Sequence, residues 1–569
     1  MNRRKTYRFM PLWLALSVVV GIFLGTFFAN RFSGNRLSII NSGSNKLTDL
    51  LHIIDDQYVD TVNMNDLVET AMPQILSELD PHSVYISAKD VQQANDDLKG
   101  SFFGIGIEFT IRQDTIHVQN VIGNGPAERA GMLAGDKIVE VDGQPFVGKE
   151  VTNELAMRKL KGEKDTKVEV GVLRYKEKKV RRITITRGEI PMKSITATYM
   201  LDDDTGYIRI KNFGEKTYPE LLIALARLSQ EGFQNLTIDL RGNTGGYLMS
   251  AVQMANEFLS RGQLIVYTEG RKSARQEYRS DGRGSYQRIP LVVLIDESSA
   301  SASEIFAGAI QDNDRGTIIG RRSFGKGLVQ QPVTLHDGSM IRLTIARYYS
   351  PSGRCIQKPY TQGDNKDYEA DILARYEHGE FFSQDSIHHT GPEYHTSNGR
   401  VVFGGGGITP DIFIPEDTVA MTSYYKEASM SGLILQFAYT YTDDNRQKLN
   451  ELQTVAEFEA YLKKVNSVEL FAAYAEKNGL KRRNLMIQRS HKLLERYINS
   501  RIIYNMRGEA EWMEYLNADD PAISETLRLF KAGEAFPKKP EPTEKKNQKV
   551  AYDYRATHQR YSMMAVALS

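Results

Sequence analysis

Residues 236–259, LTIDLRGNTGGYLMSAVQMANEFL, indicate the fold of the central part of the chain. Leu236–Leu240 predicts a buried strand, a glycine-rich turn follows it, and the apolar spacing of Tyr247–Leu259 predicts a helix. The same order recurs downstream, where Leu291–Ile295 predicts a strand and a helix is expected over about Ala302–Gln311. Strands that alternate with helices in this way are typical of a buried parallel sheet built from βα crossovers.

Upstream of this region the apolar pattern changes. Between Gly100 and about Arg187 the period becomes two and glycine separates short segments, which predicts strands. The strands are expected at residues 107–109, 116–118, 138–141, 168–173 and 180–186, with a short helix from Gly125 and a tight turn at Asp142-Gly143.

Two further segments have helical spacing. The first covers residues 47–98, with an interruption at Pro73. Its second helix is expected to end at Asp80-Pro81, because the residue before proline disfavours the α conformation. The second segment, from Thr418 to about Lys531, is charged and mostly helical in pattern, and a solvated tail rich in proline and lysine follows it.

The bulk composition excludes several classes of protein. A length of 569 residues is too great for one compact core, so several domains are expected. With 72 basic and 71 acidic residues, the net charge of +1 gives no reason to expect nucleic acid as a partner. Cys355 is the single cysteine, so no internal disulfide can form.

The N-terminus carries a targeting signal. Basic residues precede the uncharged run from Pro11 to Ala29, which is long enough to span a bilayer as a helix. Because positive residues stay in the cytoplasm, we predict a single-pass anchor in a bacterial inner membrane, with the catalytic body in the periplasm. The alternative is a signal peptide that is cleaved after export, although Phe27–Asn30 lacks a clean cleavage site.

Three segments have the residue types of a catalytic site. The serine-rich stretch Ser298–Glu304 lies between a predicted strand and a helix, where free N–H groups could stabilise an oxyanion. Its alternative is an ordinary helix cap. Lys326 is flanked by two glycines, and a lysine that is removed from water can take a proton from a serine hydroxyl. The pair Gly245-Gly246 could direct a main-chain N–H at the same oxyanion, or it could be a plain strand-to-helix turn.

Taken together, these segments resemble the carboxy-terminal processing protease family, also called tail-specific proteases. The matching segments, in chain order, are Leu79–Ser83, Leu240–Gly246, Ser299–Ile305, Gly308–Asp312, Phe324–Gln330, Thr344–Tyr349, Pro351–Arg354 and Gly407–Asp411. The resemblance covers roughly residues 46–415. It implies a protease core similar to crotonase and Clp protease subunits.

The resemblance also implies a role for each matching residue. Ser301 corresponds to the family's nucleophile, Lys326 to its general base and Gln330 to the glutamine that orients the lysine. The oxyanion donors would be the main-chain N–H groups of Ala302 and of Gly245 or Gly246. Thr244 departs from the proline of many relatives.

The stretch from residue 358 to 406 is a second departure, because it separates two motifs that are nearly adjacent in shorter relatives. It contains His378, His388, His389 and His395, whose spacing matches no standard metal site. We expect a solvated loop or a flap on the substrate side.

The strand-rich segment resembles a PDZ domain. Its carboxylate-binding loop would consist of Phe103, Gly104, Ile105, Gly106 and Ile107. Successive main-chain N–H groups in such a loop can capture a free C-terminal carboxylate while the peptide adds to a sheet edge. The alternative is a glycine-rich turn without a ligand.

The sequence therefore predicts a multidomain α+β chain. The expected parts are a cytoplasmic stub and membrane anchor (1–30), a helical domain (31–99), a PDZ domain (100–188), an α/β crotonase/Clp-like protease core (189–416, with the insertion 358–406), a C-terminal helical domain (417–535) and a charged tail (536–569). The predicted function is a serine endopeptidase that cleaves near the C-termini of extracytoplasmic proteins by a Ser–Lys mechanism, without a cofactor or metal.

Two other functions fit the sequence less well. A catalytically silent PDZ scaffold or chaperone conflicts with the presence of all three side chains of the Ser–Lys site. A Ser–His–Asp protease lacks a suitable histidine, since the nearest, His336, stands beside the hairpin signal Asp337-Gly338. The expected partners are proteins or peptides with free C-terminal tails and the inner membrane. Homodimerisation is left open.

Overall fold

The computed structural model describes residues 42–539 except 113, 175, 176, 178, 390 and 419. The chain forms two compact units that divide between Leu79 and Asp80. In the first, α2 (Ser42–Gln57) precedes α3 (Met64–Ser77), which continues through Pro73 where the sequence indicated an interruption. Asn63 caps α3, because its side chain accepts hydrogen bonds from two N–H groups of the first turn.

The predicted membrane anchor has no support in the structure. Among the described residues, no helix is both long and apolar enough to cross a membrane. The run from Pro11 to Ala29, on which the prediction rested, lies outside the described residues. The prediction of a single-pass anchor and of an inner-membrane localisation is therefore corrected.

The second unit begins with β1 (Val84–Ile86) and α4 (Val91–Lys99) and continues into the PDZ domain. This domain consists of β2 (Ser101–Gly104), β3 (Ile107–Arg112), β4 (Thr115–Val121), α5 (Pro126–Arg129), β5 (Lys137–Val141), β6 (Gln144–Pro145), α6 (Asn153–Leu160), β7 (Lys167–Leu173), β8 (Arg181–Thr186) and β9 (Gly188–Pro191). The order β3-β4-β5-β7-β8 forms an antiparallel sheet, and β2 pairs with β9. The strands and the short helix that the period-two pattern predicts are confirmed.

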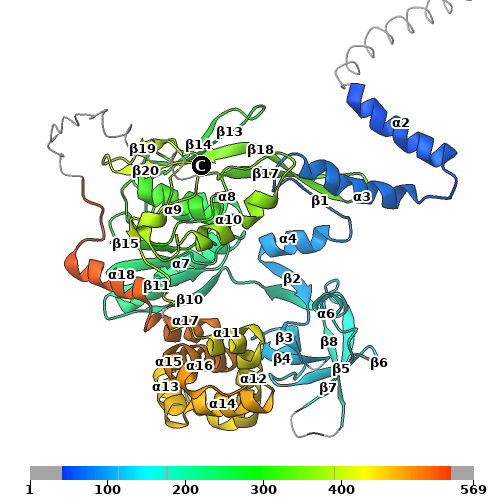
Figure 1. The fold of residues 1–569 in the computed structure, drawn as a ribbon, viewed down its shortest axis with the longest axis vertical. Helices are drawn as coiled ribbons and strands as arrows, with labels where there is room; N and C mark the ends of the chain where they lie inside the picture. The colour runs from blue at the N-terminus through cyan, green and yellow to red at the C-terminus, as the bar shows by residue number, and fades with distance from the viewer. Residues whose placement is uncertain are drawn as a thin grey trace, which may run out of the picture. The chain divides into compact units, whose positions relative to one another are not determined.

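The central sheet confirms the βα alternation of residues 236–259. Its order is β10 (Ile195–Met200), β11 (Thr205–Ile210), β12 (Asn235–Asp239), β15 (Leu291–Ile295), β16 (Thr317–Gly320) and β21 (Ile412–Phe413). All neighbours pair in parallel except β10, which runs antiparallel to β11 at the edge. The helices between these strands are α7 (Thr217–Glu231), α8 (Leu248–Asn256) and α9 (Ala302–Asp312) (Figure 1).

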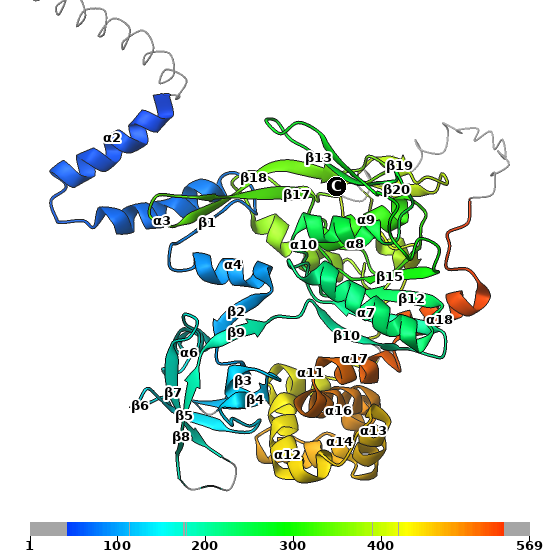
Figure 2. The same cartoon turned by 180° about the vertical axis from the view of Figure 1, so that it is seen from behind.

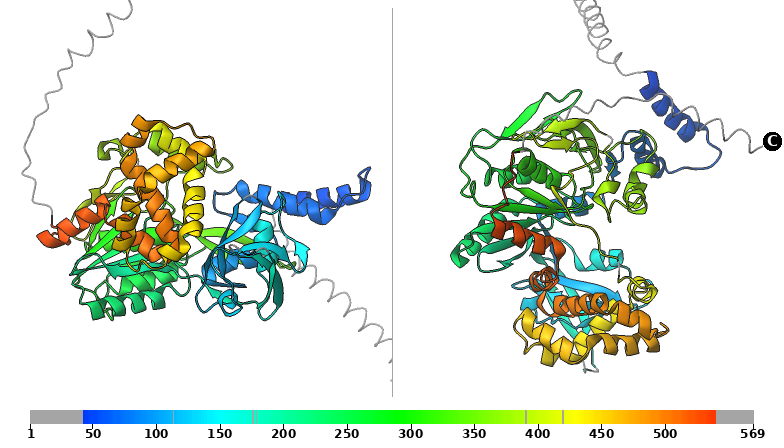
Figure 3. Two further views of the ribbon diagram at one scale, coloured as in Figure 1. Left: turned by 90° about the horizontal axis from the view of Figure 1, so that it is seen from below. Right: turned by 60° about the vertical axis from the view of Figure 1, so that its left-hand side comes forward.

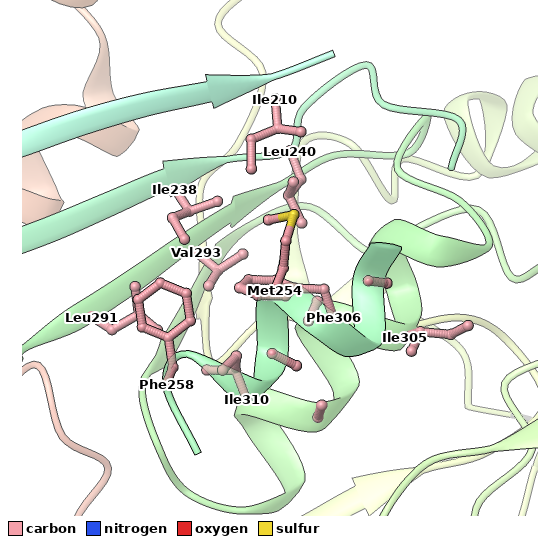
Figure 4. Close-up of a cluster of buried hydrophobic side chains, with 14 of the residues drawn as sticks. Ile210, Ile238, Leu240, Met254, Phe258, Leu291, Val293, Ile305, Phe306 and Ile310 are labelled. Atoms are coloured by element: carbon pink, nitrogen blue, oxygen red, sulfur yellow. The ribbon is translucent and has the colours of Figure 1, made fainter. Parts of the chain in front are cut away.

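These helices bury their apolar side chains against one face of the central sheet. Figure 4 shows Met254 and Phe258 beside Phe306 and Ile310, under sheet residues such as Val293. Burial of such side chains contributes about 1.5–3 kcal/mol each. This core fixes the N-terminal end of α9 relative to the turn that follows β12.

The opposite face of the same sheet is covered by the end of the described chain. Helices α17 (Glu509–Asn517) and α18 (Pro521–Ala532) pack Met513, Ile523 and Leu529 against sheet residues that include Tyr207 and Leu294. These helices appear in orange to red in Figure 3. The core is therefore a three-layer α/β/α structure.

One ion pair joins this covering layer to the turn after β12. Asp520 caps α18 and accepts a hydrogen bond from Arg241 at 2.6 Å. Arg241 also binds Asp239, the buried last residue of β12, which also pairs with Arg209. Burial would raise the pKa of Asp239, but the two guanidinium groups and the hydroxyl of Tyr207 bring it down to about 2.

The rest of the C-terminal region forms a helical bundle around its own core. Its helices are α11 (Ser423–Met430), α12 (Leu433–Leu449), α13 (Val455–Lys464), α14 (Ser467–Lys477), α15 (Asn484–Arg489) and α16 (His491–Arg507). Buried aromatic and aliphatic side chains such as Phe437, Phe458 and Phe471 fill it. The helical pattern from Thr418 onward is confirmed.

A second sheet rises over one end of the core. It contains β13 (Leu264–Glu269), β14 (Gln276–Arg279), β17 (Leu328–Thr334) and β18 (Met340–Tyr349) (Figure 2). β17 pairs with one edge of β18, and β13 and β1 pair with the other edge. The hairpin β17–β18 turns at the Asp337-Gly338 signal.

The insertion after residue 358 differs from the expected solvated loop. It contains α10 (Lys366–Glu377), the 3-10 turn η1 (Gln384–Ser386), β19 (Glu393–His395) and β20 (Val401–Phe403). The Lys358 ammonium is buried between the rings of Phe324 and Tyr368, each centroid at 4.1 Å, and binds Asp371 at 3.0 Å. The insertion is therefore packed onto the core.

Candidate active site

Ser301 lies at the N-terminal end of α9, immediately after the loop that leaves β15. Its φ is +56° and its ψ is −113°, a conformation that non-glycine residues rarely adopt. The preceding loop holds it there, because the Ser299 hydroxyl donates to the carbonyl of Leu240 at 2.9 Å and the Ala300 N–H donates to the carbonyl of Asn243 at 3.0 Å. Backbone strain of this kind persists where the surroundings over-determine it, and it occurs often at active sites.

The glycine turn after β12 lies against Ser301. A Cβ atom on Gly245 would lie 2.8 Å from Ser301 Cβ and 2.9 Å from the main-chain nitrogen of Ala302, and the φ of Gly245 is +103°. Only glycine fits such an approach. Asn243 holds the turn, because its side-chain oxygen accepts from the Gly245 N–H and its side-chain nitrogen donates to the carbonyl of Ile210, both at 2.9 Å.

Gly245 and Gly246 differ in whether their main-chain N–H groups are free. The N–H of Gly245 is already donated to Asn243. Among the described residues, no acceptor is recorded for the N–H of Gly246, and Ala302 stands in the first turn of α9, where N–H groups have no partner within the helix. The pair with free donors is therefore Gly246 and Ala302.

A buried carboxylate connects the serine to the lysine segment. Glu304 Oε2 accepts hydrogen bonds from the main-chain N–H groups of Ser301 at 2.8 Å and Lys326 at 2.9 Å. Its other oxygen accepts from the Ser323 hydroxyl at 2.5 Å and the Gly325 N–H at 2.8 Å. Burial raises the pKa of Glu304 to about 7, and the four hydrogen bonds limit that rise.

A buried tyrosine also connects Ser301 and Lys326, through their main-chain carbonyl groups. The hydroxyl of Tyr348, on β18, lies 3.0 Å from the carbonyl oxygen of Ser301 and also contacts the carbonyl oxygen of Lys326. Together with Glu304, it fixes the main chain of the two residues relative to each other.

Ser301, Lys326, Gln330, Gly245 and Gly246 all line one cleft with a volume of about 1030 Å³. Apolar side chains from α8, β14, β17 and β18 also line it, among them Leu248, Met249, Tyr278, Leu328 and Met340. In the described residues, no hydrogen bond joins Ser301 Oγ to Lys326 Nζ directly. Catalytic hydrogen bonds are often long without substrate, so this geometry is compatible with a nucleophile–base pair.

The surroundings of Lys326 make its neutral form easier to reach than that of an exposed lysine. Burial lowers the pKa of the ammonium group, and the positive charge of Arg342 lowers it further, while Glu304 and Asp80 act in the opposite direction. Arg342 also lines the cleft. A neutral amine is the form that can accept a proton.

The PDZ loop is also placed by the structure. Phe103 and Gly104 pair with Glu189 and Gly188 of β9, and the carbonyl of Ile105 accepts from the Ala127 N–H at 2.8 Å. The buried Gly106 has a φ of +82°, and Ile107 begins β3. The segment is thus held rigidly between two sheets.

Sequence reasoning missed several residues that shape the site. Glu304 stands in the serine-rich motif and Tyr348 in the Ala-Arg-Tyr-Tyr motif, but neither was given a role, since both act through main-chain atoms far away in sequence. Arg342 and the environment of Lys326 likewise depend on strand pairing. Among the described residues, no group of three or more histidine, cysteine or acidic side chains could hold a metal ion.

Comparisons with known proteins indicate the family of the chain. A family model for peptidase family S41 matches residues 204–369, one for the PDZ domain matches residues 104–186, and a family of unknown function matches residues 424–508. A carboxy-terminal-processing protease of Bartonella bacilliformis is 38% identical over 315 residues, which cover 54% of this chain and 71% of that protein. A probable CtpA-like serine protease of Staphylococcus aureus is 31% identical over 372 residues, which cover 63% of this chain and 74% of that protein.

A solved structure, the photosystem II D1 C-terminal processing protease, is 26% identical and covers 67% of this chain and 95% of its own, with a TM-score of 0.34. The sequence matches define a serine peptidase joined to a PDZ domain. The chain belongs to the carboxy-terminal processing protease family.

Proposed function

We propose that Ser301 and Lys326 form the nucleophile–base pair of this peptidase. Neutral Lys326 takes the hydroxyl proton as Ser301 Oγ attacks the scissile carbonyl, and the resulting ammonium gives the proton to the leaving amine. Lys326 then takes a proton from the water that attacks the acyl-enzyme and returns it to Ser301 Oγ as the acyl bond breaks. The N–H groups of Ala302 and Gly246 stabilise the oxyanion in both steps, and Gln330 orients the lysine.

One observation carries this proposal. Ser301, held in a strained conformation at a helix N-terminus, shares a cleft with a lysine whose pKa is lowered by burial. Glu304 joins the two residues through their main-chain nitrogens, so neither can shift independently. A silent PDZ scaffold would need neither feature.

The experiment is cleavage of an internally quenched peptide by full-length variants. Ser301→Ala and Lys326→Ala should each abolish turnover while the thermal unfolding midpoint stays close to that of the wild type. Ser298→Ala is the matched control, because Ser298 lies in the same serine-rich loop but does not line the cleft. Turnover that survives Lys326→Ala would overturn the assigned base.

We further propose that residues 103–107 of the PDZ domain bind the C-terminal carboxylate of the substrate tail. The positive charge of Lys161 beside this loop supports the assignment. The Cα of Lys161 lies 3.7 Å from the Cβ position of Gly104, and its ammonium lies 4.3 Å from the centroid of the Phe102 ring. The ammonium also lies 3.8 Å from Asp96, so its charge is shared.

Peptide binding to full-length Ser301→Ala tests this second assignment. A fluorescent peptide with a free C-terminus should bind, and the same peptide as a C-terminal amide should bind about tenfold or more weakly, because a charge-assisted set of hydrogen bonds is lost. Equal affinities would exclude recognition of the carboxylate.

A further inference from the structure

The motif Asp80-Pro81-His82-Ser83 lies beside the active site, although no role follows for it from the nucleophile–base pair. Residues 84–86 form β1, which pairs with β18 in the register Val84↔Arg342 and Ile86↔Met340. This pairing brings Asp80 and Ser83 to Thr344 on the same strand. Thr344 in turn contacts Gln330 on β17.

The hydrogen bonds around Asp80 have a fixed direction. Its Oδ1 accepts from the main-chain N–H groups of His82 at 2.9 Å and Ser83 at 3.0 Å, and it lies 3.0 Å from the hydroxyl of Thr344. Its Oδ2 lies 2.5 Å from the hydroxyl of Ser83. Because main-chain N–H groups can only donate, Asp80 acts as an acceptor, and both hydroxyl hydrogens point toward it.

A second contact confirms this direction. The main-chain N–H of Thr344 donates to the Ser83 oxygen at 3.1 Å, which leaves the Ser83 hydrogen for Asp80. Thr344 has likewise used its only hydroxyl hydrogen on Asp80. Any group that approaches the Thr344 oxygen from the other side must therefore be a donor.

That donor is the side-chain nitrogen of Gln330, at 3.3 Å from the Thr344 oxygen. We infer that Thr344 and Asp80 are positioning residues that fix the amide of Gln330, so that its oxygen rather than its nitrogen is presented to Lys326 in the cleft. This inference rests on the proposed roles of Lys326 and Gln330.

The orientation of this amide matters for the chemistry. An amide oxygen accepts a hydrogen from the lysine nitrogen and leaves the lone pair of the neutral amine free for the Ser301 proton. An amide turned the other way would donate an N–H to that lone pair and occupy the base. The hydrogen bonds from Gln330 to Thr344 and from Thr344 to Asp80 exclude this second orientation of the amide, without either Thr344 or Asp80 touching the substrate.

The test compares kcat and KM for cleavage of a quenched peptide by full-length variants. Thr344→Val has nearly the same shape but no hydroxyl, and it should lower kcat about tenfold or more with KM within about twofold. Thr344→Ser restores the hydroxyl and should stay within about threefold of the wild type. Asp80→Ala provides an independent variant, because it removes the acceptor of the Thr344 hydroxyl, and its kcat should fall by a factor similar to that of Thr344→Val.

Two further variants separate positioning from a loss of structure. Thr334→Val makes the same substitution at an exposed position of the same hairpin and should leave kcat unchanged. If Thr344 acts through Gln330, the double variant Gln330→Ala/Thr344→Val should be no slower than Gln330→Ala alone. Once Gln330 is absent, Thr344 has no amide left to orient, so its substitution should have no additional effect.

The outcomes are distinct. Wild-type kcat in Thr344→Val, or fully additive losses in the double variant, would overturn the positioning role while the proposed nucleophile and base stand. Turnover in Ser301→Ala or Lys326→Ala would instead overturn the proposed function itself.

Discussion

The carboxylate of Glu304 accepts a hydrogen bond from the main-chain N–H of Lys326 at 2.9 Å, although the two residues are separated by 22 positions. The same oxygen accepts from the residue that begins the helix, Ser301. The loop that carries the lysine is thus tied to the helix that carries the serine. The buried Glu304 therefore fixes the separation between the proposed nucleophile and the proposed base.

Glu304→Gln should therefore damage both stability and rate. Each carboxylate oxygen accepts two donors, so the amide nitrogen must face two of them in either orientation. We expect the free energy of unfolding to fall by about 2 kcal/mol and kcat to fall with it.

Glu220→Gln is the matched control for that variant. Glu220 on α7 also accepts two main-chain N–H groups, those of Ser194 at 2.8 Å and Ile195 at 2.9 Å, but it does not line the cleft. It should lose stability and keep its kcat. Equal effects of both variants on kcat would contradict a specific tie between serine and lysine.

The pH dependence of cleavage should report the charge on Lys326. Because burial and Arg342 lower its pKa, kcat/KM should rise with pH to a midpoint below the usual range of an exposed lysine, near 10.5. Arg342→Gln removes a positive neighbour, which raises the pKa of Lys326 and moves the midpoint to higher pH. Arg347→Gln, at an exposed position of the same strand, should leave the midpoint in place, and a shift there would argue for a general effect of charge.

Gly245→Ala should remove activity for a steric reason. The new Cβ would lie 2.7 Å from the Ala300 carbonyl oxygen and 2.8 Å from Ser301 Cβ, so the turn or the serine must move. Gly232→Ala is the control, since its φ is also positive, at +86°, but nothing lies within 4 Å of the added atom. It should cost about 1–2 kcal/mol of stability and leave kcat intact. Steady-state kinetics and thermal unfolding of both variants separate the effect of a strained backbone from the effect of a steric clash with Ser301.

Asp520→Ala should weaken the covering layer of the sheet. It removes both the cap of α18 and the partner of Arg241, so we expect a loss of about 1–2 kcal/mol in the free energy of unfolding. Glu525→Ala breaks only an exposed pair with Arg528 and should lie within about 0.5 kcal/mol of the wild type. Similar losses in the two variants would mean that the Arg241 contact contributes nothing.

The contribution of the same region to the free energy of unfolding should depend on pH through Asp239. Its pKa in the folded chain, about 2, lies below its ordinary value of 3.8, so its contribution to stability is present above about pH 4 and is lost as the pH falls toward 2. Asp239→Asn should therefore flatten the acid side of the stability curve, which denaturant titrations at several pH values can measure.

Local pattern was enough to predict the strands and helices that carry Ser301, Gly245 and Gly246, because the chemistry of a strand–turn–helix unit lies within one short segment. The cleft that brings Lys326 to them depends on pairing between distant strands, and periodicity does not contain that information. The Asp80–Thr344 contact spans 264 positions and could not be predicted from either segment alone.

Two expectations failed for different reasons. The insertion after residue 358 is polar on average, yet Lys358 and Tyr368 are buried within it through a cation–aromatic contact that composition does not reveal. The anchor was inferred from hydropathy alone, and no helix of the described chain supports it.

The cover that α17 and α18 place over the second face of the central sheet has a consequence for biosynthesis. A nascent chain that has emerged from the ribosome only as far as residue 508 leaves Tyr207, Val292 and Leu294 without the side chains that bury them. The central sheet is therefore buried on both faces only once the chain has been synthesised through α18, which ends at Ala532.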